Sequence, residues 1–359
     1  MNVKNLKKMT ALMVALIWVV SLLGCTAQQA DEHTANPQQA ESPAQEPVVS
    51  QEQSTVEREP VLKEINHYTM RNDETYFLTA QDQEYVKVLL EGVLNRAEFV
   101  ALSKDYDANL RVLIAATENP YWFFVQKETF NKDHTGVYLT YQYGAEEQAQ
   151  MLDFMDQEYL TILNSIITPE MNDTDKALAV HHYFGQRITY DYDWLDAMNM
   201  SDEKYLFPDI VVYEALKTGR GVCHTYSYLC EFALRQLGVE CIRFMDDLNG
   251  NENDGHMWLL VKLDGTYYHM DTTWDSNGSD MVGLAHFGMT DEERQNDGFD
   301  LNLYTMDSSY HGISCSDSRF QILRDVQDYE YLGNHRWKLY TDSGTEAVYH
   351  SDTGLRTES

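Results

Sequence analysis

The segments Gly219-Arg-Gly-Val-Cys223-His-Thr-Tyr226, Gly255-His256-Met-Trp258 and His269-Met-Asp271-Thr-Thr-Trp274 decide the fold of this chain. In this order they supply a thiol, an imidazole and a carboxylate, the three groups of a cysteine-based acyl-transfer site. A single cysteine would indicate little. The set is informative because each residue lies where the local pattern predicts a position suited to its role.

Cys223 follows two glycines, and the spacing of apolar residues predicts a helix that begins at this cysteine and ends at Gly238. At the first turn of a helix the dipole stabilises a thiolate and lowers the pKa of the thiol. The unpaired N–H groups of the same turn can stabilise an oxyanion. The alternative is a buried structural thiol, which the position after Gly-Arg-Gly argues against.

His256 and Asp271 are expected to meet across a β-hairpin. Asp264-Gly265 lies between two runs of alternating apolar residues, which is a strong signal for a two-residue turn. If Leu263 pairs with Thr266, His256 and Asp271 become diagonal neighbours on one face of the sheet. The sequence therefore places a base next to the acid that would orient it.

Gly221-Val-Cys-x-x-Tyr226, Gly255-His-x-Trp258 and Asp271-x-Thr-Trp-Asp275 resemble the catalytic core of the transglutaminase-like superfamily, which has a papain-like arrangement. The resemblance implies an α+β fold in which a helix bearing the cysteine packs on an antiparallel sheet bearing the histidine and the aspartate. It implies Cys223 as nucleophile, His256 as base and Asp271 as third member. In some relatives an upstream aromatic residue supports the oxyanion hole, and Tyr190 is the candidate here. The alternative for Tyr190 is an ordinary core tyrosine.

The organisation of the chain is predicted from composition and periodicity. Residues 61–165 are expected to form an α+β domain of unknown role, residues 166–291 the core, and residues 292–359 a β-rich extension. Residues 121–125 and 266–274 are read as strands. The sequence leaves open the roles of residues 61–165 and 292–359, and the oligomeric state.

The first sixty residues predict export. Residues 1–24 combine three lysines with a short apolar run, as in a signal peptide. Leu22-Leu23-Gly24-Cys25 resembles the lipobox of bacterial lipoproteins, which implies lipidation of Cys25. Residues 25–60 are polar and proline-containing, which is typical of a disordered tether. The expected location is the outer face of a bacterial cell membrane, and the alternatives are an uncleaved anchor or simple secretion.

The charge excludes some partners. The formal net charge of the chain is −32, and removal of residues 1–24 takes away three lysines and no acid, giving −35. A field of this sign disfavours nucleic acid and anionic lipid headgroups. No cofactor is expected. A zinc site made from Cys223, His224, His256, His269 and Asp271 lacks the tight Cys/His pairs of structural sites. A calcium loop near Asp247 is rejected because Glu252 stands where glycine is needed.

These observations predict an exported cysteine enzyme that acts on amide bonds of proteins or peptides, cell-wall peptides among them, through a thioester acyl-enzyme. Water as the second substrate would make it a peptidase or amidase, and an amine would make it a transglutaminase. The sequence does not distinguish these. The alternative is a non-catalytic cell-surface module that keeps the fold for binding.

Overall fold

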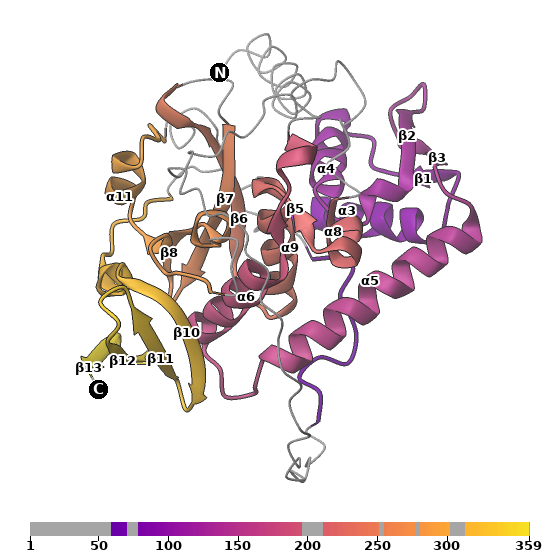
Figure 1. Cartoon of the computed structure of the whole chain (residues 1–359). Helices are drawn as coiled ribbons and strands as arrows, with labels where there is room; N and C mark the ends of the chain where they lie inside the picture. Colours follow the sequence, from indigo (N-terminus) through magenta and orange to yellow (C-terminus); the bar gives the residue numbers. More distant parts are fainter. Residues whose placement is uncertain are drawn as a thin grey trace, which may run out of the picture.

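The computed structural model describes residues 59–69, 78–195, 211–250, 255–276, 281–301 and 313–358. Within these ranges lie four sheets, with strand orders β1-β3-β2, β4-β5, β6-β7-β8-β9 and β10-β11-β12-β13 (Figure 1). The predicted α+β class is confirmed. The helices of eight or more residues are α3 Ala80–Leu94, α4 Tyr106–Thr117, α5 Ala145–Ile166, α6 Asp173–Arg187, α8 Val211–Thr218 and α9 Cys223–Gln236.

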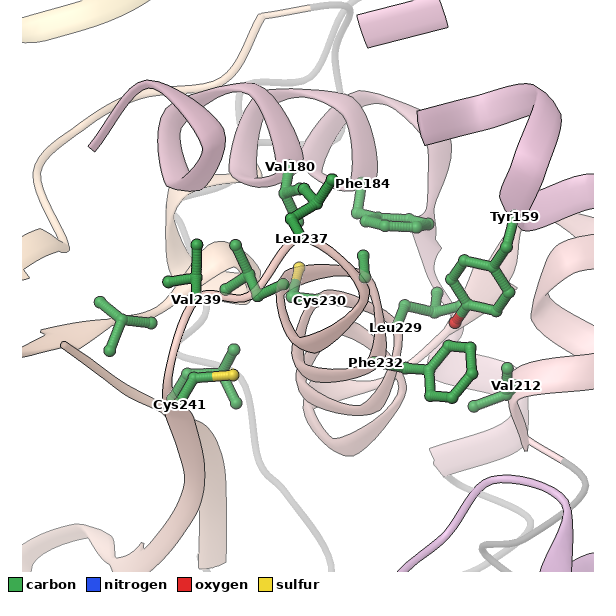
Figure 2. Close-up of a cluster of buried hydrophobic side chains, with 14 of the residues drawn as sticks. Tyr159, Val180, Phe184, Val212, Leu229, Cys230, Phe232, Leu237, Val239 and Cys241 are labelled. Carbon is green, nitrogen blue, oxygen red and sulfur yellow. The ribbon is translucent and has the colours of Figure 1, made fainter. Parts of the chain in front are cut away.

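Helix α9 is the central helix of the fold. It contacts α6, α8 and the strands β6 and β7, so its side chains are buried on several sides. Leu229, Cys230 and Phe232 lie in a cluster with side chains from α5, α6 and α8 (Figure 2). Because burial of apolar surface is the main favourable term in folding, this packing fixes the position of α9 and of its first residue.

The sheet beside α9 consists of β6 Cys241–Asp247, β7 Gly255–Leu263, β8 Thr266–Met270 and β9 Phe287–Met289, all antiparallel. The predicted hairpin register is confirmed, since Leu263 pairs with Thr266. The predicted strand over 266–274 is wrong beyond Met270. Asp271 begins a short helix, α10 Thr272–Asp275, because its side chain accepts the N–H groups of Thr273 and Trp274.

The N-terminal elements include a second departure from expectation. Residues 121–125 are not a strand: Trp122–Phe124 form a 3-10 helix, and the strand β2 begins at Val125. All four residues 121–124 are buried, and a single turn of helix buries consecutive side chains that a half-exposed strand would not. The other strands here are β1 Phe99–Ala101, β2 Val125–Phe130 and β3 Gly136–Tyr141.

The C-terminal residues form an antiparallel sheet next to α6 (yellow in Figure 1). One buried apolar cluster includes residues of the N-terminal elements, of the α9 region and of this sheet. The domain boundaries predicted above therefore stay a prediction. Among the described residues no helix is both long and apolar enough to cross a membrane. The remaining elements are β10 Val326–Gly333, β11 Arg336–Thr341, β12 Glu346–His350, β13 Leu355–Glu358, β4 Thr189–Tyr190, β5 Arg220–Gly221, α11 Asp291–Asn296, and the 3-10 helices Leu248–Gly250 and Arg319–Leu323.

Candidate active site

Cys223 is the first residue of the 14-residue helix α9. Two glycines make this entry possible. Gly219 has a φ of +67°, which favours glycine, and a Cβ on Gly221 would lie 2.4 Å from the Thr225 side chain. The space at Gly221 is thus filled by Thr225, whose hydroxyl accepts the N–H of Val222 at 3.1 Å. Gly221 therefore has a packing role at the start of α9.

The first turn of α9 is joined to the strand that carries His256. The Ser227 hydroxyl lies 3.0 Å from the carbonyl oxygen of Cys223 and 3.1 Å from that of Met257. The Met257 side chain also packs against the small cluster formed by Leu195, Val222 and Cys223. Residues 223 and 257, which are far apart in sequence, are therefore neighbours, and His256 directly precedes Met257.

His256 and Asp271 meet as predicted. The Nε2 atom of His256 lies 2.7 Å from the Oδ2 atom of Asp271, and both side chains are buried. Since Nε2 is engaged by the carboxylate, Nδ1 is the nitrogen that could exchange a proton with a substrate or a thiol. An aspartate in this position fixes the tautomer and the orientation of the ring.

Asp271 is held on both oxygens. Oδ1 accepts the N–H groups of Thr273 and Trp274, and Oδ2 accepts hydrogen bonds from His256 and from Arg294 Nη2 at 3.1 Å. Burial alone would raise the pKa of Asp271, but His256, Arg294 and His286 together hold it well below the ordinary value. The carboxylate is therefore ionised and immobile.

Sequence reasoning missed Arg294. It lies on α11, is completely buried, and its guanidinium carbon is 4.3 to 4.7 Å from the ring centroids of Trp258, Phe299 and Trp274. The same three aromatic rings stack against the imidazole of His256. From sequence, an arginine in a short acidic helix is expected to be exposed. The capping box of Thr290 and Glu293 predicts where this helix begins, and it does not predict that Arg294 is buried.

Tyr190 lies next to Cys223. It pairs with Gly221 in the two-stranded sheet β4-β5, and its side chain packs on the cluster of Val222 and Cys223. Burial raises the pKa of Tyr190, and the charge of Asp271 adds to this effect, so its hydroxyl stays protonated. A protonated hydroxyl can donate a hydrogen bond, which is the property an oxyanion hole needs.

His269 does not compete for Asp271. Its Nδ1 atom accepts the indole N–H of Trp258 at 2.8 Å, and its Nε2 atom lies 2.9 Å from Asp291 Oδ1. Burial lowers the pKa of His269 to about 4, so the ring is neutral. Because Trp258 can only donate, the proton of His269 is on Nε2.

That tautomer argues against a metal at the group formed by His269, Asp291 and Cys315, whose ligand atoms lie within 4.8 Å of one another. A metal on Nε2 would require the proton on Nδ1, where it would oppose the N–H of Trp258. The zinc alternative also loses His256 and Asp271, which pair with each other. Within the part of the chain that the structure describes, this group of residues does not suit a metal ion.

Asp275, the last residue of the third motif, is buried and contacts two histidines. Its Oδ2 atom lies 3.2 Å from His181 Nε2, and its Oδ1 atom lies 3.0 Å from His286 Nδ1. Against the effect of burial, these contacts hold the pKa of Asp275 at about 2, below its ordinary 3.8. The hydrogen bond and the charge of Asp275, with the charge of Asp271, outweigh the desolvation of His286 and raise its pKa.

This pKa predicts a pH-dependent contribution to stability. A lowered pKa means that ionised Asp275 stabilises the fold above its unfolded value of 3.8, and that this stabilisation is lost as the pH falls towards 2. We expect Asp275→Asn to lose less stability than the wild type between these pH values, by roughly 2 kcal/mol. Urea unfolding at both pH values measures the difference. Parallel pH curves for the two proteins would contradict the assignment.

The cysteines differ in state. Cys230, Cys241 and Cys315 are buried, and Cys230 and Cys241 are free thiols. Cys223 is disulfide-bonded. A disulfide blocks a nucleophile, so the chemistry considered below belongs to the reduced protein. Burial raises the pKa of Cys230 to about 12, and that of Cys241 is raised as well.

Comparison with known proteins gives one family match. Residues 161–272 match the family model described as the transglutaminase-like superfamily, and no curated protein matches the chain significantly. Three solved structures show partial likeness. A proposed cysteine protease from Cytophaga hutchinsonii is 15% identical to this chain. The alignment covers 36% of this chain and 44% of that protein, with a TM-score of 0.25. A TGase is 14% identical, and the alignment covers 52% of this chain and 47% of that protein, with a TM-score of 0.29. A proposed protease from Parabacteroides distasonis is 9% identical, and the alignment covers 41% of this chain and 30% of that protein, with a TM-score of 0.25. The alignments thus span less than half of each of these proteins.

Proposed function

The chain contains a transglutaminase-like core, and we propose that this core is a cysteine enzyme acting on amide bonds of peptides or proteins. The observation that carries the proposal is the buried hydrogen bond of 2.7 Å between His256 and Asp271, beside the first turn of the helix that Cys223 begins. Ser227 and Met257 support the proposal, because they connect the turn of Cys223 to the strand of His256.

In the proposed reaction His256 takes the proton of the Cys223 thiol, and the sulfur attacks the carbonyl carbon of an amide. The carbon–nitrogen bond then breaks, and His256 returns the proton to the leaving amine. A thioester of Cys223 remains. Attack by water gives a carboxylic acid, attack by a primary amine gives a new amide, and both regenerate the thiol.

Two features would stabilise the negative oxygen of the tetrahedral intermediate. Backbone N–H groups at the start of α9 carry the positive end of the helix dipole. The hydroxyl of Tyr190 is the second candidate, because Tyr190 packs beside Cys223 and stays protonated. Asp271 would stabilise the imidazolium of His256 during the transfer.

Thiol labelling tests the activated cysteine without a known substrate. After reduction and removal of the reductant, we expect iodoacetamide at neutral pH to modify Cys223 at least about 100-fold faster than Cys230, Cys241 or Cys315. Cys230 and Cys241 serve as internal controls, because burial raises the pKa of both. Peptide mass spectrometry measures each rate. Equally slow modification of all four would reject the proposal.

The location of the enzyme is also part of the proposal. The segments that predict it lie outside the described residues. The basic and apolar segment 1–24 and the box ending in Cys25 support export and lipid anchoring. Peptides and proteins at the cell surface, cell-wall peptides included, would then be the available substrates. Intact-mass analysis of membrane-extracted protein tests this: a diacylated Cys25 N-terminus is expected, and an unmodified Met1 would refute it.

A further inference from the structure

We infer that Arg294 is a positioning residue for the proposed reaction: its guanidinium fixes the orientation of Asp271 and sets how strongly Asp271 stabilises protonated His256. The inference rests on the proposed function, since it assigns a role within the same site. It differs from that function because neither the three motifs nor the family match, which ends at residue 272, includes Arg294.

The geometry places Arg294 and His256 on one oxygen atom. Arg294 Nη2 donates to Asp271 Oδ2 at 3.1 Å, and His256 Nε2 lies 2.7 Å from the same atom. The second nitrogen of Arg294, Nη1, donates to Asp297 Oδ2 at 3.1 Å. A charge-assisted bond of this kind is stronger than a neutral one and has a defined direction. The arginine therefore restricts the carboxylate to the plane in which His256 meets it.

The aromatic residues make the arrangement rigid. Trp258, Trp274 and Phe299 contact both the guanidinium of Arg294 and the imidazole of His256. The Arg294 side chain is fully buried, so its charge is poorly screened by solvent. Helix α11 is itself fixed, because Asp291 at its first position contacts His269 on β8. Arg294 thus has little freedom to leave Asp271.

The charges predict the direction in which each substitution changes the stability of the His256 imidazolium. Asp271 favours the protonated form of His256, and a cation on the same oxygen offsets part of that negative charge. Removal of the cation would leave the charge of Asp271 uncompensated and favour the imidazolium up to a higher pH. Removal of Asp297, which offsets Arg294, would act in the opposite direction. Among the described residues, Tyr190, His269 and His286 also act on Asp271 from neighbouring elements, and Asp246 lies opposite His256 on β6.

The test is the pH profile of alkylation of reduced Cys223 by iodoacetate, with the modified peptide quantified by mass spectrometry. The negative reagent reacts fastest with a thiolate next to an imidazolium, so the rate should rise and then fall with pH. We expect the falling limb to move to higher pH by about one unit in Arg294→Met, whose side chain still fits the aromatic box. Arg294→Lys keeps the charge and should leave that limb within a few tenths of a unit, at about the wild-type pH.

Asp297→Asn is the second variant, and it keeps the test decisive if Arg294→Met fails to fold by circular dichroism. Asp297 is partly exposed, and its loss should move the falling limb to lower pH. An unmoved limb in Arg294→Met and Asp297→Asn would overturn the inference, as would equal shifts in the Met and Lys variants. Lower rates with an unchanged profile would reduce Arg294 to a packing role. A wild type without any bell-shaped profile would instead reject the proposed function itself.

Discussion

Replacement of Cys223 by alanine is expected to abolish every product that the chain forms from a peptide substrate. The proposed thioester cannot form without the sulfur, and loss of a covalent nucleophile lowers kcat by more than about 1,000-fold. The assay is mass spectrometry of reduced protein incubated with casein or cell-wall peptides and a primary amine. Amine incorporation would identify a transglutaminase, and cleavage or deamidation would identify a hydrolase.

Two controls make the result interpretable. Cys241→Ala removes a buried thiol of β6 from the core and should leave product formation within about threefold of the wild type. Circular dichroism must show that Cys223→Ala is folded. Products of equal yield from wild type and Cys223→Ala would contradict the mechanism. A wild type that binds the peptides and forms no product would favour the surface-binding alternative.

Replacement of Asp175 by alanine is expected to destabilise the protein by roughly 3–5 kcal/mol. Asp175 is fully buried on α6 and accepts the indole N–H of Trp337 at 2.7 Å and the hydroxyl of Ser351 at 2.5 Å on Oδ1. Its Oδ2 atom lies 2.5 Å from His335 Nδ1 and accepts the N–H of Asn172. Alanine would leave all four groups without this acceptor, and unsatisfied buried donors are costly.

Urea unfolding of the full chain measures the effect. Asp173→Ala is the matched control, because Asp173 lies on the same first turn of α6 but its side chain is 44% exposed and forms an ion pair with Lys176 on the same helix. An exposed pair contributes about 0–1 kcal/mol. If Asp175→Ala were as stable as Asp173→Ala, the C-terminal sheet would not depend on this carboxylate for its attachment to α6.

These predictions differ in how far the sequence anticipates them. The helix start at Cys223, the hairpin at Asp264-Gly265 and the pairing of Leu263 with Thr266 follow from local rules on glycine, turns and alternation. Parity then brings His256 and Asp271 to one face, and the structure joins them at 2.7 Å. The strand predicted beyond Met270 failed, because Asp271 caps α10 with the side chain that also holds His256.

Asp175 illustrates the opposite case. Its position three residues after Asn172 gives a capping box that sequence can read. Its partners Trp337 and Ser351 are more than 160 residues away, and no local pattern connects them. Arg243 on β6 also depends on the fold, because it contacts Glu118, which lies 125 residues away in the N-terminal elements, as well as Glu231 of α9.

The local geometry of the three motifs follows from the amino-acid sequence, because turns, helix starts and strand alternation depend on neighbouring residues. The cation and the aromatic rings that enclose the pair of His256 and Asp271 are brought there by long-range contacts that no local pattern predicts. Arg294 reaches Asp271 because α11 folds back onto β8, and this return depends on long-range packing. Whether a charged side chain is buried depends on contacts distant in sequence, and those are set by the fold as a whole.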